Sequence, residues 1–288
     1  MMIFGAGFSG LAIARALAGD CDFAGGTTRS PERFQALQSA GLIPFIYQGG
    51  IPSEDLNAAL SEITHLVMSI SPDAAGDPLL QLFAEGLRKS MPKLEWIGYL
   101  STVGVYGDHG GEWVDEETPC RPKSKRSIAR LAAEDGWTGL ATEAGVPLAI
   151  LRLSGIYGPG RNALKTMHEG KARRLIKPGQ VFNRIHNADI GGATALLARQ
   201  RLGGIYNVTD GLPAPPQDVV SEAARVMGVE PPAEIDFETA ELSPMARSFY
   251  GENKRVSNAK IKAAGYDFLY PDYHTGLAAL YDEGSWQQ

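Results

Sequence analysis

Three glycines near the start of the chain have the spacing of a phosphate-binding turn. They are Gly5, Gly7 and Gly10. They follow the apolar run 1–4, which is typical of a strand, and precede the amphipathic stretch 11–18, which is typical of a helix. In such a unit the first glycine allows a tight turn, the second lets backbone amides approach a pyrophosphate, and the third lets the helix pack on the strand. Phe8 and Ser9 would lie at the positive end of that helix, so the pattern predicts a dinucleotide-binding start rather than an ordinary glycine turn.

The end of the next predicted strand indicates which dinucleotide is bound. Residues 22–29 form that strand, and its end carries Thr28, Arg29 and Ser30, with Arg33 one helical turn further. Sites that prefer NAD usually place an Asp or Glu here, where it accepts hydrogen bonds from the ribose. A carboxylate would repel the 2′-phosphate of NADP, whereas a guanidinium binds it with paired hydrogen bonds. The sequence therefore favours NADP over NAD; the alternative is that Arg29 and Arg33 are ordinary solvent-exposed charges.

Runs with strand character alternate with helical patterns along most of the chain. Further strands are expected at residues 42–47, 64–71, 94–101, 147–153 and 204–208. Helices are expected at residues 31–40, 54–60, 77–90, 124–144 and 188–199. This alternation predicts an α/β fold of the Rossmann type, a doubly wound parallel sheet with helices on both faces. Ligands bind at the carboxyl ends of such strands, so we expect Ser69 and Ser71 beneath the cofactor.

Composition and charge exclude several other classes of protein. The chain has 288 residues, a net charge of −6 and 44% hydrophobic residues, which describes a globular protein without the basic surface of a nucleic-acid binder. Arg15 interrupts the apolar N-terminal stretch, unlike a secretory signal, and no run of about 20 apolar residues could cross a membrane. Cys21 and Cys120 have no neighbours with metal-ligand spacing. We therefore expect a cytoplasmic location and no metal site.

Longer motifs lie along the chain after the glycine turn. They are LSTVGVYG (100–107), DEETP (115–119), LRLSGIYGPGR (151–161), RIHNADI (184–190), YNVTDG (206–211), KRVSNAK (254–260) and YPDY (270–273). In this order they resemble the motifs of extended short-chain dehydrogenases/reductases, the superfamily that includes the nucleotide-sugar epimerases and dehydratases, and the resemblance covers nearly the whole chain. It implies a Rossmann domain made of residues 1–157 and 185–210, and a smaller C-terminal substrate lobe made of residues 158–184 and 211–288.

The resemblance also implies a catalytic trio, from which this chain departs. In the family a Ser or Thr orients the substrate, and a Tyr-x-x-x-Lys pair on a helix transfers the proton and holds the nicotinamide ribose. The hydroxyl position falls on Thr102, with Ser101 beside it, whereas the tyrosine and lysine positions fall on Arg126 and Arg130. Arginine stays protonated at neutral pH and cannot act as a general base. Arg130 can still donate to the ribose, but Arg126 should hold an anionic or carbonyl group without exchanging protons.

Two functions remain open for such a chain. In the first it is an oxidoreductase or epimerase-like enzyme that acts on a carbonyl or nucleotide-sugar-type substrate, with Thr102 orienting the substrate. Tyr106 is then the best candidate for a relocated proton donor, because in the family its loop lies beside the nicotinamide; the alternative is a packed loop aromatic. In the second function the chain binds NADP without turnover, as a redox sensor or regulator. The retained Ser101–Thr102 pair favours the enzyme.

Other residues are expected around the cleft between the two parts of the chain. By resemblance, Gly155 and Ile156 contact the cofactor, and three arginines reach the substrate: Arg161, Arg184 and Arg255. Several guanidinium groups in one cleft would suit a diphosphate or carboxylate, although each alone is more often part of an ion pair. The expected partners are a small-molecule substrate and a second copy of the chain, since helices on the sheet edge could pair two subunits as they do in the family.

Overall fold

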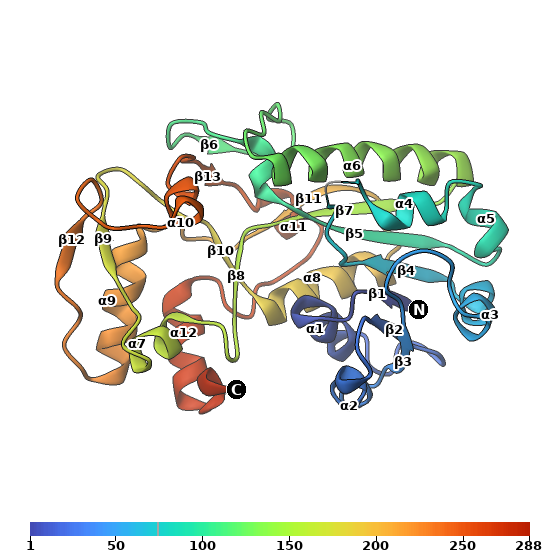
Figure 1. Cartoon of the computed structure of the whole chain (residues 1–288), viewed down its shortest axis with the longest axis horizontal. Coiled ribbons are helices and arrows are strands. Elements are labelled where there is room, and N and C mark those ends of the chain that lie inside the picture. Colours follow the sequence, from blue (N-terminus) through green and yellow to red (C-terminus); the bar gives the residue numbers. More distant parts are fainter. Residues whose placement is uncertain (74) are drawn as a thin grey trace.

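The computed structural model describes residues 1–73 and 75–288, and its centre is a seven-stranded parallel sheet (Figure 1). The strands are β1 (Met2–Phe4), β2 (Gly25–Thr28), β3 (Ile43–Ile46), β4 (His65–Met68), β5 (Trp96–Thr102), β7 (Leu148–Leu153) and β11 (Gly204–Val208). Their order across the sheet is β11-β7-β5-β4-β1-β2-β3. The chain thus winds outward from β1 to β3 and then from β4 to β11, and in sheets with such a reversal ligands bind at the carboxyl ends of the central strands. The predicted Rossmann-type sheet is confirmed.

Helices cover both faces of this sheet (Figure 1). One face carries α1 (Phe8–Ala16), α2 (Phe34–Ser39) and α8 (Asn187–Arg199). The other carries α3 (Glu54–Glu62), α4 (Pro78–Leu82), α5 (Leu87–Ser90) and α6 (Lys125–Ala144). Each layer buries its apolar side chains in a separate cluster against the sheet, because the central strands have both faces covered, whereas Ile43 and Ile46 of the edge strand β3 are exposed. None of the helices described here combines the length and the hydrophobicity that a membrane span requires.

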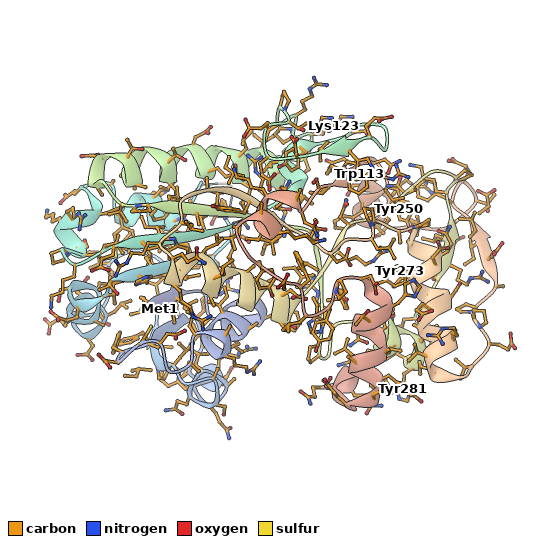
Figure 2. The ribbon with its side chains drawn as sticks, turned by 180° about the vertical axis from the view of Figure 1, so that it is seen from behind. Met1, Trp113, Lys123, Tyr250, Tyr273 and Tyr281 are labelled. Atoms are coloured by element: carbon orange, nitrogen blue, oxygen red, sulfur yellow. The ribbon has the colours of Figure 1, made fainter. Side chains whose placement is uncertain are left out.

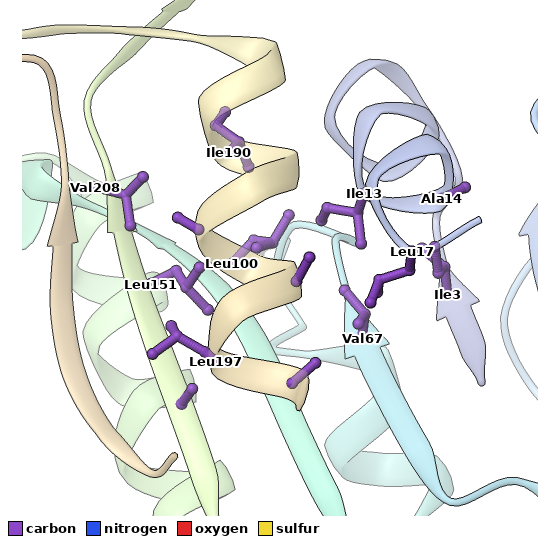
Figure 3. Packing of buried hydrophobic residues seen from close by; sticks show 14 of the residues in the cluster. Ile3, Ile13, Ala14, Leu17, Val67, Leu100, Leu151, Ile190, Leu197 and Val208 are labelled. Carbon is purple, nitrogen blue, oxygen red and sulfur yellow. The ribbon is translucent and has the colours of Figure 1, made fainter. Parts of the chain in front are cut away.

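Helices α1 and α8 pack closely because a glycine lies where they meet. A Cβ at Gly191 would lie only 2.6 Å from the carbonyl oxygen of Ala12, so a larger residue would push the helices apart. Figure 3 shows Ile13 of α1, and Leu197 of α8, among the buried side chains between these helices and Leu151 of the sheet. This packing fixes the start of α1 against β1, and with it the glycine turn.

A smaller unit lies beyond the carboxyl edge of the sheet (Figure 1). Its elements are β8 (Gly155–Tyr157), α7 (Ala163–His168), β9 (Arg174–Ile176), β10 (Arg184–His186), α9 (Pro216–Met227), β12 (Glu234–Asp236), α10 (Pro244–Phe249), α12 (Tyr273–Asp282) and the 3-10 turn Ser285–Gln287. It has its own apolar cluster, in which Leu164 and Leu277 are almost fully buried. Figure 2 shows Tyr273 and Tyr281 along α12, well away from Met1 on the sheet.

Three short segments link this unit to the sheet. Strand β6 (Trp113–Val114) pairs in parallel with β13 (Arg255–Val256), and α11 (Ala259–Ala263) returns to pack beside β11. The chain therefore passes between the sheet and the smaller unit several times. As a result, α11 packs on the sheet, whereas α12, which follows it, belongs to the smaller unit.

The predicted helix over residues 77–90 is wrong as one element. Two short helices, α4 and α5, replace it, and Gly86 between them has a φ of +105°, which a continuous helix does not allow. The predicted helix at residues 31–40 opens instead as the 3-10 turn Pro31–Arg33, because Pro31 follows the extended Ser30. The other predicted strands and helices differ from the observed ones only at their ends.

Candidate cofactor and substrate site

The turn between β1 and α1 leaves room for a phosphate where the sequence predicts one. Gly5 has a φ of +81° and its N–H donates to Thr27 Oγ1 at 2.9 Å, which ties the turn to the end of β2. A Cβ at Gly10 would lie 3.1 Å from the Gly5 carbonyl oxygen, so this glycine keeps α1 close to β1. Gly7 is the N-cap of α1, without a side-chain cap, and a Cβ there would meet no described atom nearer than 3.9 Å. The first N–H groups of α1 are therefore open to an anion.

The start of α1 also reaches the loop after β8. A Cβ at Gly158 would lie 3.3 Å from Phe8 Cζ, so the two segments are in contact distance, while Ser9 is buried behind them. Gly155 is exposed and Ile156 half-buried on β8. Phe8 of α1 therefore lies near the loop that directly follows β8, the strand of Gly155 and Ile156.

Two arginines at the carboxyl end of β2 are available to bind an anion. Arg29 and Arg33 are exposed, and within the described residues neither side chain has a hydrogen-bond or ion-pair partner. Ser30 Oγ donates to Glu32 Oε2 at 2.7 Å, and Thr28 Oγ1 accepts from the Ser30 N–H at 3.3 Å. These bonds fix the backbone of the strand end, so both guanidinium groups extend from a defined position.

Arg130 of α6 braces the ends of β4 and β5. Its Nη1 donates to the Leu100 carbonyl at 2.8 Å and to the Tyr99 hydroxyl at 3.2 Å, and its Nη2 donates to Ser71 Oγ at 2.8 Å. Burial raises the pKa of Tyr99 to about 12, so that hydroxyl stays protonated. Ser69 precedes this brace at the end of β4. Arg130 and Ser71 therefore lie together at the predicted ligand edge, although much of the guanidinium is already hydrogen-bonded.

Behind this edge lies a buried carboxylate that sequence reasoning missed. Glu134 accepts from Arg152 Nε at 3.2 Å and Nη2 at 2.7 Å, and also from Ser101 Oγ. All three side chains are at most 5% exposed. Ser101, which the sequence assigned to the cofactor, instead turns its hydroxyl to Glu134. The one sequence signal for Glu134 is its position one helical turn after Arg130 on the same face of α6.

Tyr106 does not face the crevice. Its side chain has no exposed surface, its hydroxyl donates to Asn207 Oδ1 at 2.7 Å, and the Arg152 guanidinium lies 4.9 Å from the centre of its ring. Burial raises the pKa of Tyr106 to about 12. A proton donor must reach its substrate. The structure therefore contradicts the expected role of Tyr106 and favours the packed aromatic.

Thr102 and Arg126 each have side-chain hydrogen-bond donors without an acceptor among the described residues. Thr102 ends β5 and caps the 3-10 turn Val103–Tyr106, because its Oγ1 accepts from Gly104 N at 3.1 Å; its hydroxyl proton is left to donate elsewhere. Arg126 is exposed in the first turn of α6, and its side chain has no partner within residues 1–73 and 75–288. The two predicted arginines of α6 thus differ. Arg130 is buried and hydrogen-bonded to residues after β4 and in β5, whereas Arg126 is exposed and has no partner among the described residues.

The three substrate arginines do not converge. Arg184 donates to two backbone carbonyl oxygens at 3.0 and 3.1 Å, and burial lowers its pKa. Arg255 donates to the Gly111 carbonyl oxygen. Arg161 is exposed after β8, unpartnered among the described residues. Two of the three are therefore engaged by backbone carbonyl oxygens: Arg184 within the smaller unit, and Arg255 between β13 and the loop before β6.

Two further buried charges lie where the smaller unit joins the sheet. Lys254 is 7% exposed; its Nζ donates to the Gly107 carbonyl at 2.6 Å and to Glu252 Oε2 at 2.8 Å. Asp210 is 1% exposed and accepts from Leu212 N at 3.1 Å, while its Oδ2 has no partner in the described chain. Lys254 and Asp210 both lie inside motifs by which the sequence resembles the family. Their residue types, however, did not indicate that they are buried.

Comparison with known proteins points to one family. Residues 82–208 match the family model described as the NAD dependent epimerase/dehydratase family. The central part of the chain therefore resembles this family. The match begins after the glycine turn, so the turn is identified by its own geometry.

Solved structures and a curated relative resemble this chain over nearly its whole length. A functionally unknown conserved protein from Silicibacter pomeroyi DSS is 42% identical, with a TM-score of 0.90, over 99% of this chain and 98% of that one. UDP-glucuronic acid 4-epimerase from Bacillus cereus, in complex with NAD, is 20% identical with a TM-score of 0.76, over 98% and 95%. Protein YeeZ of Escherichia coli (strain K12) is 28% identical over 94% of this chain and 96% of its own. The epimerase supports the fold alone.

Proposed function

We propose that this protein binds NADP and acts as an oxidoreductase or epimerase-like enzyme on a carbonyl or nucleotide-sugar-type substrate. The observation that carries the proposal is the pair of unpartnered guanidinium groups, Arg29 and Arg33, beside the open N–H groups of α1. A pyrophosphate on α1 would leave a 2′-phosphate near these arginines, where charge-assisted, paired hydrogen bonds are strongest. NAD lacks that phosphate and would leave both guanidinium groups unused.

The residues at the crevice have separate tasks in this proposal. When bound, the nicotinamide supplies or takes up a hydride. Thr102 would orient the substrate oxygen with its free hydroxyl proton, and Arg130 would donate to the ribose from its position between β4 and β5. Arg126 would stabilise negative charge on the substrate without giving up a proton. The substrate would lie between the sheet and a lobe made of residues 158–184 and 211–288.

The test is a side-by-side titration of the purified protein with NADPH and NADH, followed by nicotinamide fluorescence. We expect Arg29→Asp to weaken NADPH binding by more than about tenfold and to spare NADH, because the new carboxylate repels only the 2′-phosphate. Arg15→Asp is the matched control, since Arg15 is also exposed but lies on the outer surface of α1. Equal losses for the two cofactors would refute the assignment of Arg29 to the 2′-phosphate.

One observation favours a second candidate function, an NADP-binding sensor or regulator without turnover. The Tyr106 hydroxyl is committed to Asn207, and residues 107–156 contain no tyrosine that could replace it. The two functions differ in whether a substrate is converted. A panel of carbonyl compounds and nucleotide sugars is added separately to the NADPH and the NADP⁺ complexes, and both the near-ultraviolet absorbance and the chromatographed products are followed. Oxidation of NADPH, or conversion of any member of the panel without net change in the cofactor, favours the enzyme; neither, with intact NADPH binding, favours the sensor.

A further inference from the structure

We propose that Arg121 and Arg126 form a second anion site beside Thr102, and that the substrate therefore carries a carboxylate or phosphate group. This inference rests on the proposed function, because it assigns a substrate class to the same crevice. It uses residues of the sheet-bearing part of the chain and none of the smaller unit.

Unpartnered arginines gather at the carboxyl edge of the sheet. Most arginines in the described chain donate to a carboxylate or a backbone carbonyl. The exceptions, whose side chains have no such acceptor among the described residues, are Arg15, Arg29, Arg33, Arg121, Arg126 and Arg161. Two of these follow β2 and belong to the proposed cofactor site. Two more, Arg121 and Arg126, lie between the end of β5 and the first turn of α6. The carboxyl end of β5 belongs to the edge where a parallel sheet binds its ligands.

Both arginines are held against the turn that Thr102 caps. The Arg121 N–H donates to two carbonyl oxygens of that turn, each at 3.1 Å. Next to Arg126, the buried Ser127 packs on the same turn: a Cβ at Gly104 would lie 2.8 Å from Ser127 Oγ and 3.4 Å from Thr102 Oγ1. The Arg121 backbone and the residue next to Arg126 are thus both fixed against the turn that begins at Thr102, while both guanidinium groups remain exposed.

Basic side chains are concentrated in one segment next to this turn. Residues 118–133 carry five basic and no acidic side chains, and the nearest acidic residues in sequence are Glu117 and Glu134 at its two ends. Arg126 lies in the first turn of α6, where the helix dipole disfavours a cation and no acidic residue offsets it. Lys123, at the outer surface in Figure 2, lies 3.6 Å from Asp108 and is the one basic side chain of this segment with a carboxylate within ion-pair distance in the described structure.

Nearby carboxylates are already engaged. Asp108 accepts from the N–H groups of Gly110 and Asn253, and these bonds hold its pKa below the usual range. Glu116 accepts from Asn207 N at 2.7 Å. Neither is left to neutralise Arg126. A carboxylate or phosphate of the ligand would do so with paired hydrogen bonds, whereas a neutral substrate would not.

Anion binding to the NADPH-saturated protein tests this site, because bound NADPH fills the glycine turn and the Arg29 position. Inorganic phosphate and acetate are titrated separately by calorimetry at constant ionic strength, which distinguishes a phosphate from a carboxylate ligand. We expect one of them to bind, and Arg126→Gln or Arg121→Gln to weaken it by about tenfold, the loss of one charge-assisted hydrogen bond. Arg126→Lys should restore part of the affinity, because it keeps the charge but not the paired geometry.

Lys125→Gln is the control, since it removes the same charge from the neighbouring position of α6 and is not part of the proposed site. Equal weakening by Lys125→Gln would overturn the inference in favour of a diffuse field, and so would failure of both anions to bind the NADPH complex. The NADPH affinity of each protein is measured first. Absence of NADPH binding in the unmodified protein refutes the proposed function, whereas intact NADPH binding without an anion site refutes only this inference.

Discussion

Among single residues, Asp210 has the most unusual environment. Burial raises its pKa from 3.8 to about 7, and Asp272 and Asp189 act in the same direction. The Leu212 N–H and the Arg184 guanidinium oppose the shift without cancelling it. Asp210 lies just after β11, where the chain leaves the sheet. Its charge therefore affects the stability of the junction with the smaller unit.

We predict that Asp210 makes the folded state less stable as the pH rises. A carboxyl whose pKa is raised on folding contributes its full stability below the unfolded value near 4, and loses it as the pH rises through about 7. The slope is at most about 1.4 kcal/mol per pH unit. Asp210→Asn should flatten the change in free energy of unfolding between pH 5 and 8, measured in urea about every half unit. The exposed Asp267→Asn should keep it, and an unchanged slope in Asp210→Asn would contradict the prediction.

At the scale of elements, helix packing depends on where a glycine lies. A Cβ at Gly191 of α8 would meet the backbone of Ala12 on α1 at 2.6 Å, whereas one at Gly139 of α6 would meet nothing within 4 Å. We expect Gly191→Ala to lower the free energy of unfolding by about 1–3 kcal/mol through overpacking. Gly139→Ala, its matched control, should raise it by up to about 1 kcal/mol, because alanine favours the helix. Urea unfolding followed by tryptophan fluorescence measures both; equal signs would refute the packing argument.

At the scale of the whole molecule, the smaller unit is hydrogen-bonded to the sheet-bearing part through residues 252–257. The Asn253 N–H donates to Asp108 at 2.9 Å, the Arg255 N–H to the Glu112 carbonyl at 2.9 Å, and Lys254 crosses to the Gly107 carbonyl. The two parts are therefore joined by hydrogen bonds from three consecutive residues, and the middle one, Lys254, uses its buried ammonium group. The molecule should therefore unfold as one unit.

We predict a single urea transition for the whole chain, lowered by about 2 kcal/mol in Lys254→Met, because the substitution leaves Glu252 and a buried carbonyl without their donor. Lys260→Met, at an exposed lysine of α11, should change stability little. Two separate transitions in the unmodified protein, seen by comparing fluorescence with circular dichroism, would show that the smaller unit unfolds alone.

The sequence by itself determined the Rossmann-type sheet and the glycine turn. Both depend on short-range patterns: the alternation of strands and helices, and three glycines that stand within the first ten residues between a strand and a helix. Gly5 and Gly10 have the conformation and the close contacts that their spacing predicts. The break between α4 and α5 escaped this reading, because the positive φ of Gly86 does not follow from its neighbours.

Only the tertiary structure decided which polar side chains face the crevice. The sequence made Tyr106 a candidate proton donor, but in the structure its hydroxyl donates to Asn207, 101 residues further along. The Ser101 hydroxyl donates to Glu134, 33 residues further along, and the Arg184 guanidinium to the carbonyl oxygen of Ala214, 30 residues further along. The physical reason is that a buried polar group must find a partner, and that partner is supplied by whichever segment the fold brings near. Thr102, Arg121 and Arg126 kept their side-chain donors because the fold brought them no such partner.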